Sequence, residues 1–389
     1  VRDSIDGNSG INFSQEVVQE FQLSSVNFDL STPITATGAI NIVTRTGGNE
    51  FHGSGYYFFR DHNMAAYPAL ARNPVNPDPF FARRQAGFWF GGPIQKDKMF
   101  FFLNFEHLNQ DSVVTVQPNS PFFRDLVQNA ASPYTGKQFS PRFDWRISPN
   151  HTLFVRYSTD RNNAFGPRGG ATLPSNWLVN RNYADQGVVG LTSTLRPNLV
   201  SDVRATWWYW SNRNLFPSER ECPGCLGLGL PETSIVGTNV IFGNTQNATQ
   251  GRNLRRGNLL GTMNWQKGDH RIKFGGEIEI GDGVGFWGYA DPAAGAVYGP
   301  DFILSVAGQA GLQQFGLPSS FRTNADLMRL PIVTYTMGIG NPAQPPPYNA
   351  SRARRNDRYR WFMQDTWRIK PRFTLNYGLA WQYETTLVN

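Results

Sequence analysis

The fold is indicated most directly by a stretch near the end of the chain, Phe373-Thr374-Leu375-Asn376-Tyr377-Gly378-Leu379-Ala380-Trp381-Gln382-Tyr383. Every second residue from Phe373 to Tyr383 is large and apolar, and the residues between them are small or polar. Successive side chains of a β-strand point to opposite faces, so the run predicts a strand with one apolar face. A strand of about 9–11 residues crosses a bilayer at a tilt, and this run has that length.

The same alternation recurs along the chain and predicts an all-β, antiparallel transmembrane β-barrel. We expect eleven strands, near residues 50–61, 81–94, 98–110, 137–148, 151–162, 184–196, 199–212, 253–266, 270–281, 357–369 and 373–384. Short turns join them in pairs: Ile94-Gln95-Lys96-Asp97, Ser148-Pro149-Asn150, Arg196-Pro197-Asn198, Gln266-Lys267-Gly268-Asp269 and Lys370-Pro371-Arg372. Long polar loops are expected between the hairpins, at residues 63–80, 111–136, 163–183, 213–252 and 282–356. Short turns at one end and long loops at the other are typical of outer-membrane barrels.

The composition favours strands and turns over helices. Aromatic residues make up 14% of the chain and charged residues only 17%, with 39 Gly and 26 Pro. No stretch of 18 apolar residues occurs, so no transmembrane helix is expected. The 36 Lys and Arg exceed the 29 Asp and Glu, but they form no concentrated stripe. We therefore expect no nucleic-acid partner, and a cationic lumen or loop surface facing anionic lipid or solute accounts for the charge.

Aromatic residues are placed where a membrane interface would use them. Trp207, Trp208, Tyr209 and Trp210 are expected to end one strand, and Trp361 with Trp367 lie near the two ends of another. Amphipathic rings at strand ends suit an interfacial girdle between acyl chains and headgroups. Ordinary aromatic packing in a soluble β-sandwich is the competing interpretation.

The N-terminal part differs from the rest. A polar segment leads to a short strand with Val17, Val18, Phe21 and Leu23, and a second apolar strand occupies residues 37–47. This compact element joins the first long strand directly, through Gly47-Gly48-Asn49. We expect it to lie inside the lumen of the barrel.

This junction resembles the plug-to-barrel junction of TonB-dependent outer-membrane transporters, and more narrowly of the Oar-like group. The run extends from Gly38 to Gly53, and its junction residues are Gly38, Ile40, Asn41, Val43, Thr44, Gly47, Phe51 and Gly53. Further matches follow in the expected order: Phe88-Trp89-Phe90-Gly91-Gly92-Pro93-Ile94-Gln95-Lys96-Asp97-Lys98-Met99-Phe100-Phe101-Phe102, His270-Arg271-Ile272-Lys273-Phe274-Gly275-Gly276-Glu277, and Gln364-Asp365-Thr366-Trp367-Arg368-Ile369 before Leu375-Asn376-Tyr377-Gly378-Leu379. The resemblance covers the chain from about residue 15 to its end.

The resemblance implies a division into residues 1–48, the C-terminal part of a plug domain, and residues 49–389, the N-terminal half of a barrel. About eleven of 22 strands would then be present, and a 22-stranded lumen is wide enough to need a plug. An odd strand count, a first residue Val1 and a last strand without a closing element lead us to expect a fragment of a longer polypeptide.

The implied function is import through a plugged barrel in the outer membrane of a Gram-negative bacterium. The implied partners are outer-membrane lipid, an unknown solute (siderophore, oligosaccharide or peptide) and a TonB-type energy-transducing protein, which would act through sequence upstream of this chain. A half barrel is expected to form a curved open sheet or a strained closure.

Alternation of side chains also selects candidates for the lumen wall. The polar residues that fall on the inward face are Asn104, Glu106, Arg156, Arg204, Lys273 and Glu277. Most of them are expected to be solvated wall, and some to bond the plug. Cys222 and Cys225 lie in one Cys-Pro-Gly-Cys unit of a long loop, and a local disulfide is the favoured interpretation over a redox motif or a zinc site.

No enzyme is expected, because no catalytic constellation is found. The five histidines include no His-Glu-x-x-His pair, and neither a Gly-x-Ser-x-Gly elbow nor a phosphate-binding glycine loop occurs. We therefore predict no catalytic residue, metal site or cofactor. Two other functions remain open: a passive or adhesive outer-membrane barrel that binds a surface partner through its loops, and a soluble all-β module that binds glycan or nucleic acid.

Overall fold

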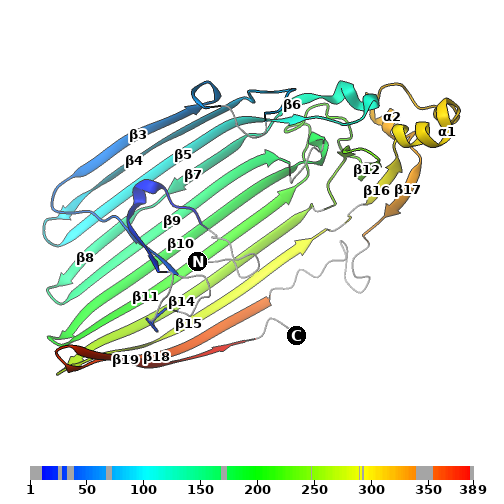
Figure 1. The fold of residues 1–389 in the computed structure, drawn as a ribbon. Helices are drawn as coiled ribbons and strands as arrows, with labels where there is room; N and C mark the ends of the chain where they lie inside the picture. Colours follow the sequence, from blue (N-terminus) through cyan, green and yellow to red (C-terminus); the bar gives the residue numbers. More distant parts are fainter. Residues whose placement is uncertain are drawn as a thin grey trace.

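A large antiparallel sheet dominates the molecule (Figure 1). The computed structural model describes residues 11–24, 29–32, 39–66, 72–167, 173–246, 248–288, 290, 293–338 and 354–385. The main sheet has 13 strands, and separate sheets of four and two strands accompany it. Among the described residues, no helix is both long enough and apolar enough to cross a membrane.

The eleven expected strands are present in the main sheet, and its antiparallel pairing is confirmed. Its strands are β3 (His52–Asp61), β4 (Phe81–Gln95), β5 (Met99–Val116), β6 (Gln128–Ala131), β7 (Tyr134–Phe139), β8 (Arg142–Ser148), β9 (His151–Gly166), β10 (Leu178–Arg196), β11 (Leu199–Leu215), β14 (Gln250–Lys267), β15 (His270–Trp287), β18 (Arg354–Lys370) and β19 (Phe373–Glu384). Neighbours along the chain are neighbours in the sheet, in the order β19-β18-β15-β14-β11-β10-β9-β7-β5-β4-β3. The sheet is open, with β3 and β19 at its edges.

The five expected short turns all occur, and they lie at one end of the sheet (Figure 1). The turn between β10 and β11, for example, consists of Pro197 and Asn198. The long connections lie at the opposite end. We call these the turn end and the loop end.

One expected strand, residues 137–148, is divided into β7 and β8. The break falls at Ser140 and Pro141. Ser140 still exchanges backbone hydrogen bonds with Asn104 of β5, but Pro141 has no N–H to donate to the sheet. Several other strands run further into the loops than their alternation indicated, β10 by six residues at its start.

The long polar loops that the sequence predicts lie at the loop end, but much of their length is ordered there. Residues 117–127, 173–177, 216–246 and 293–336 contain a packed unit, which we call the cap. It contains the short helices η3 (Pro121–Leu126), η4 (Pro174–Asn176) and α2 (Asn324–Leu327), the helix α1 (Pro300–Gln314), and the sheet β13-β12-β16-β17 with strands β12 (Glu232–Val236), β13 (Ile241–Phe242), β16 (Ala294–Tyr298) and β17 (Ile332–Thr336). Apolar side chains from separate loops, among them Phe123, Trp177 and Phe321, are buried together, and this burial favours an ordered cap.

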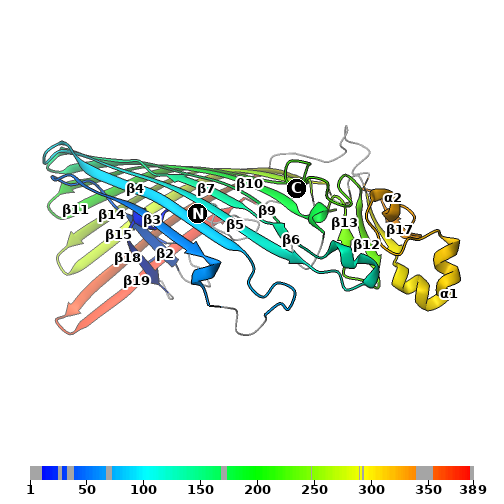
Figure 2. The same cartoon turned by 90° about the horizontal axis from the view of Figure 1, so that it is seen from above.

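The N-terminal residues form a small element on one face of the main sheet. The short helix η1 (Gln15–Val17) leads into β1 (Val18–Ser24), which pairs with β2 (Ala39–Thr44). Seen from above, the main sheet is curved and this hairpin lies on its concave side (Figure 2). We call that side the inner face, the opposite side the outer face, and residues 11–24, 29–32 and 39–49 the N-terminal segment. A further short helix, η2 (His62–Met64), follows β3.

The outer face carries an apolar belt with a sharp upper limit. On β11 the outer positions run Val203, Ala205 and Trp207, all apolar, and then Tyr209, Ser211 and Arg213 towards the loop end. Trp207 is 49% exposed and stacks on Tyr209. Trp361 and Trp381 form a similar outer pair on β18 and β19.

The expected aromatic girdle is therefore only partly correct. Trp208 and Trp210 alternate with Trp207 and Tyr209 and so point to the inner face, where Trp208 is fully buried. β11 also continues to Leu215 instead of ending at the four aromatic residues.

Candidate functional site

The candidate site is the contact between the N-terminal segment and the inner face. Residues of the segment reach side chains on strands from β3 to β18, nearly the whole width of the sheet. The contacts form three groups and a junction.

The first group holds the start of the segment. Ser14 donates a hydrogen bond from its hydroxyl to Glu106 of β5, at 2.9 Å, and lies 3.1 Å from the hydroxyl of Tyr56 on β3. Tyr56 donates to the same carboxylate oxygen, at 2.7 Å. The Nδ2 of Asn12 donates to Asp160 of β9, at 2.9 Å. A buried carboxylate is expensive to leave without donors, so these bonds fix the segment at Glu106 and Asp160.

The second group holds the end of β2. The guanidinium of Arg142 on β8 donates to both the carbonyl and the hydroxyl oxygen of Thr44, at 3.1 and 2.8 Å. Arg142 is oriented by Asp144, which it binds at 2.8 Å. Arg156 of β9 lies over the ring of Phe13, 5.5 Å from its centre. Arg142 thus binds the end of β2, and Arg156 packs on Phe13 near the start of the segment.

The third group lies across the sheet from the first, on β15 and β18. Lys273 donates to the carboxylate of Asp29 and to the hydroxyl of Ser31, both at 2.7 Å. Arg360 donates to the carbonyl oxygens of Ser31 and Leu30. Burial works to raise the pKa of Asp29, but hydrogen bonds from Lys273 and Ser31 outweigh it and hold this pKa below its ordinary value. Asp29 therefore stays ionised opposite Lys273.

The junction with the barrel wall depends on close backbone approach. A Cβ atom at Gly47 would lie 2.9 Å from the carbonyl oxygen of Gly92 and still closer to that of Phe101. Asn49 fixes the next residues, because its side chain both donates to and accepts from Asp97 in the turn between β4 and β5, at 2.6 and 2.7 Å. The chain then enters β3 after Phe51, whose ring stacks on Phe90.

The structure places the residues chosen from the sequence as follows. Glu106, Arg156 and Lys273 lie on the inner face and contact the N-terminal segment. Asn104 is fully buried there and donates to the carbonyl of Phe88, and Glu277 accepts hydrogen bonds from Asn258 and Arg360. Arg204 also faces inward but is paired with Asp202, and among the described residues it makes no hydrogen bond or ion pair with the N-terminal segment.

Of the junction residues, Thr44, Gly47 and Phe51 make the contacts above. Gly53 packs against the backbone of Trp89, Val43 is exposed, and the backbones of Ile40 and Asn41 pair with β1. Gly38 lies outside the described residues.

Sequence reasoning missed Tyr56, Arg142, Asp160 and Arg360 as contacts of the segment. All four occupy inward positions of strands that the alternation had identified. The alternation of side chains along each strand could have placed them on the inner face, but it could not show which of the many inward polar residues contact the segment.

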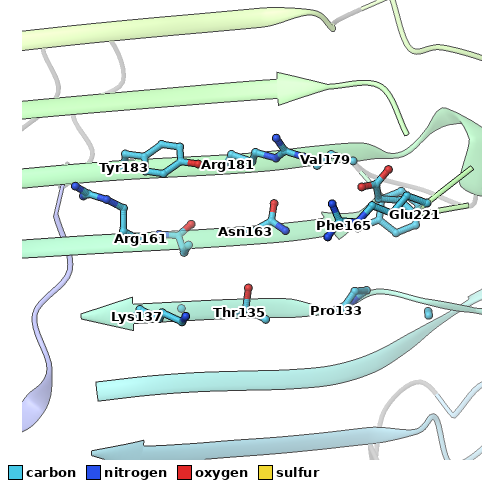
Figure 3. A pocket seen from close by; sticks show the side chains of 14 residues that line it. Pro133, Thr135, Lys137, Arg161, Asn163, Phe165, Val179, Arg181, Tyr183 and Glu221 are labelled. Atoms are coloured by element: carbon cyan, nitrogen blue, oxygen red, sulfur yellow. The ribbon is translucent and has the colours of Figure 1, made fainter. Parts of the chain in front are cut away.

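The outer face holds a second feature, a pocket of about 560 Å³ near the loop end (Figure 3). Its floor is formed by outward residues of β7, β9 and β10, including Lys137, Arg161 and Arg181. Arg220 and Glu221, from the loop after β11, complete its wall.

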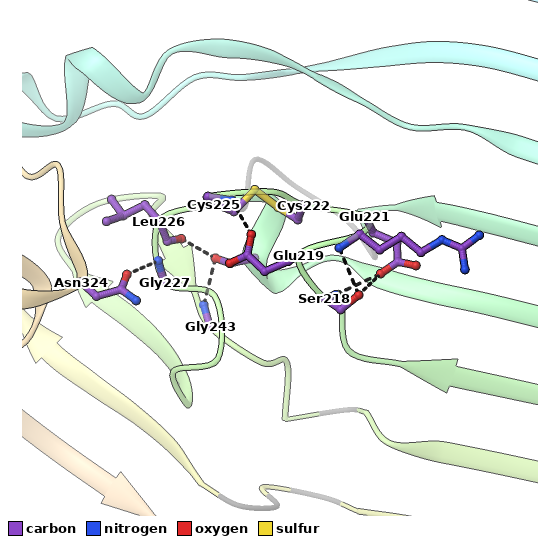
Figure 4. Close-up of a disulfide and its surroundings, with 12 residues drawn as sticks. Ser218, Glu219, Glu221, Cys222, Cys225, Leu226, Gly227, Gly243 and Asn324 are labelled. Atoms are coloured by element: carbon purple, nitrogen blue, oxygen red, sulfur yellow. Dashed lines mark hydrogen bonds between the residues drawn. A yellow bond between two sulfur atoms is a disulfide. The ribbon is translucent and has the colours of Figure 1, made fainter.

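That loop is shaped by a disulfide between Cys222 and Cys225 (Figure 4). Hydrogen bonds surround it: Glu219 accepts from the backbone of Gly224 at 2.8 Å, and Glu221 accepts from the hydroxyl of Ser218 at 2.6 Å. Gly227 donates to Asn324 of α2, at 2.7 Å, and so ties the loop to the rest of the cap. The bond from Ser218 keeps the pKa of Glu221 below its ordinary value, so its carboxylate is ionised.

Comparison with known families decides the nature of the sheet. Residues 43–122 and 114–389 match the family described as outer membrane beta barrel domain. The chain belongs to this family. The outer-membrane barrel domain thus presents its apolar belt to the lipid of the outer membrane of a Gram-negative bacterium, which contradicts the alternative of a soluble all-β module.

Solved structures with a similar fold support this assignment of the barrel domain. The outer membrane transporter YddB from Escherichia coli matches with a TM-score of 0.57 at 13% identity, over 91% of this chain and 41% of that chain. The siderophore receptor PirA from Acinetobacter baumannii matches with a TM-score of 0.53 at 14% identity, over 90% and 41%. A mutant of the ferric enterobactin receptor PfeA from Pseudomonas aeruginosa matches with a TM-score of 0.52 at 13% identity, over 90% of this chain and 41% of that chain. The barrel domain thus spans about two fifths of the length of these structures, and no curated protein matches it.

In the part of the chain that the structure describes, no group of three or more His, Cys, Asp or Glu residues could hold a metal ion.

Proposed function

We propose that this chain is the end of the plug and the first half of the barrel wall of a TonB-dependent outer-membrane transporter of the Oar-like group. Residues 1–48 belong to the plug and residues 49–389 to the barrel. A solute binds at the external mouth, and a TonB-type protein, acting through sequence upstream of this chain, displaces the plug. The solute is a siderophore, an oligosaccharide or a peptide.

The observation that carries the proposal is the polar attachment of the N-terminal segment across the inner face. Glu106, Arg142 and Lys273 hold it from three different parts of the sheet. An element that closes a lumen has to be held from several sides of the wall, as this one is.

The chemistry of the attachment also suits a movable plug. A hydrogen bond inside a protein contributes only about 0.5–1.5 kcal/mol net, because water offers replacement partners when the bond breaks. The two partners of the ion pair between Lys273 and Asp29 are both partly exposed, and such pairs contribute little. A pulling force can therefore exchange these contacts for water one by one.

Energised transport is tested in cells of the native host. The full-length gene is deleted, and uptake of labelled iron complexes, oligosaccharides and peptides is compared with that of the parent strain, with and without a protonophore. We expect one solute class to require the gene and its uptake to stop when the proton gradient is dissipated. Gene-dependent uptake that continues in the presence of the protonophore would overturn the proposal.

A second candidate, an adhesive barrel that binds a surface partner through its loops, is favoured by the cap. The cap is an ordered unit at the loop end and exposes Val306 on α1 and Ile332 on β17. Loss of surface binding in the deletion strain, with uptake of every solute unchanged, would favour this candidate over the importer.

A further inference from the structure

The pocket on the outer face is lined mainly by cationic side chains, and these have no role in the proposed transport. Its lining includes the cationic side chains of Lys137, Arg161, Arg181 and Arg220, against the single carboxylate of Glu221. It lies on the side of the sheet opposite the N-terminal segment, so it does not open towards the proposed solute path.

Most of this positive charge is not neutralised by the protein. Arg161 binds Asp185 through both carboxylate oxygens, at 2.7 and 2.8 Å. By contrast, no carboxylate of the described residues lies within ion-pair distance of Lys137, Arg181 or Arg220. Glu221 is engaged with Ser218. The pocket therefore favours an anionic group that brings several acceptor oxygens, as a phosphate does.

The height of the pocket identifies the class of ligand. Arg161 lies four residues beyond Tyr157 on the same face of β9, which is about 13 Å along a strand. Tyr157 is level with Trp207 across β10, at the upper limit of the apolar belt. The cations thus lie at the level of the lipid headgroups, and exposed Val155 and Val189 lie below them at the level of the acyl chains.

The upper wall closes the pocket towards the cap. Phe165 and Val179 form its far end and are buried in the hydrophobic core of the cap. The disulfide between Cys222 and Cys225 holds the loop that carries Arg220 and Glu221 over the floor. The pocket is therefore open towards the membrane and closed on the side away from it.

We infer that this pocket binds the phosphorylated headgroup of a lipid in the outer leaflet, with the acyl chains lying against the apolar belt below it. Lys137, Arg181 and Arg220 bind the phosphate oxygens, and Arg161 is positioned at the rim by Asp185. The inference rests on membrane insertion of the barrel and is independent of whether the protein transports a solute.

The test uses the full-length protein, purified from outer membranes and placed in nanodiscs of phosphatidylcholine. The nanodiscs contain lipid A with its phosphates, dephosphorylated lipid A, or neither, and bound lipid is measured by native mass spectrometry. We compare wild type with the double variant Arg181→Gln and Arg220→Gln. The matched control is Arg124→Gln with Arg329→Gln, which removes two exposed arginines of the cap outside the pocket.

The expected result is phosphate-dependent retention of lipid A by wild type and the control, and retention on the order of tenfold weaker in the double variant, since each cation near an anionic headgroup contributes measurably. Equal retention in all three proteins, or equal retention of the dephosphorylated lipid, would overturn the inference. If inorganic phosphate binds wild type more tightly than the double variant while lipid A is retained equally by both, the pocket binds free phosphate and the lipid assignment fails. Lys137→Gln, a single exposed substitution, provides the same comparison if the double variant does not fold.

Discussion

Gly47 is a residue at which the backbone of the N-terminal segment lies close to the backbone of the barrel wall. Its Cα faces backbone atoms of Gly92 and Phe101, which cannot rotate away as a side chain can. We expect Gly47→Ala to lower the free energy of unfolding by roughly 1–3 kcal/mol, the usual cost of overpacking. The measurement is urea unfolding of the protein in lipid vesicles.

Gly48 provides the control for this substitution. A Cβ atom at Gly48 would meet nothing within 4 Å, so Gly48→Ala should change the free energy of unfolding by less than about 0.5 kcal/mol. Equal effects of the two substitutions would show that the close approach at Gly47 does not matter for stability.

Asp29 is expected to give the attachment of the N-terminal segment a defined pH dependence. Its pKa in the folded protein lies below the ordinary value of 3.8. A carboxyl group with a lowered pKa stabilises the folded state above the unfolded-state value, and this contribution is lost as the pH falls through the folded-state value. The contact with Lys273 should therefore persist from neutral pH to about pH 4 and disappear below it.

A spin label at Thr32 reports this release as increased mobility in electron paramagnetic resonance spectra. In the Asp29→Asn variant, the spin label should already be mobile at neutral pH, and its mobility should not change further on acidification. A label that remains immobile in Asp29→Asn would mean that Arg360, which binds the neighbouring carbonyl oxygens, is sufficient to hold residues 29–32.

At the scale of elements, β2 is attached to the wall mainly through its last residue. Thr44 is buried and accepts two hydrogen bonds from Arg142. Thr44→Val keeps the shape and removes the hydroxyl, which accepts from Arg142 at 2.8 Å and from Arg156 at 3.5 Å, so both guanidinium groups lose a side-chain acceptor, at a cost of about 1–3 kcal/mol. Limited proteolysis of the N-terminal segment should become faster.

Thr46→Val is the matched control for Thr44→Val, because the exposed hydroxyl of Thr46 bonds only to the neighbouring carbonyl of Gly47. Its proteolysis should be that of wild type. If both variants are cleaved at the wild-type rate, the contact with Arg142 does not hold β2 in place.

The elements of the main sheet could be predicted from sequence because each strand carries its own evidence, an alternation that both faces of a membrane wall require. The cap could not be predicted in the same way. Its core joins Val116 and Phe165, which lie at the loop ends of β5 and β9, with Phe321 of a distant connection. These residues are apolar, but the sequence around them shows no repeating pattern that would mark them as a core. These residues form a core only because the tertiary fold brings them together.

The same limit applies to the candidate site. The alternation of side chains placed Lys273 and Glu106 on the inner face, because the face of a residue depends only on its position in its own strand. The alternation could not predict that Arg360 contacts Leu30, since 330 residues separate the two and they belong to different parts of the fold. The missed contacts are therefore those that depend on how the segment is placed against the wall.

At the scale of the whole molecule, the division into an outer and an inner face is tested most sharply at two adjacent leucines of β14. Leu259 lies on the outer face, 49% exposed, level with Ala205 and Ile278 in the apolar belt. Leu260 points to the inner face between Arg204 and Glu277. The two residues share a type, a strand and a depth, and differ in the side to which they point.

We expect Leu259→Arg to lower the free energy of unfolding in lipid vesicles by about 1–3 kcal/mol, because a cation on the lipid face of a barrel is costly and Leu259 lies between the middle of the belt and its upper limit. Leu260→Arg should cost less than about 1 kcal/mol, since its charge would meet water and the carboxylate of Glu277 on the inner face. In detergent micelles, which deform around a charge more easily than a bilayer, the difference should shrink. A larger cost for Leu260→Arg than for Leu259→Arg would reverse the assignment of the two faces, and with it the placement of the N-terminal segment inside the barrel.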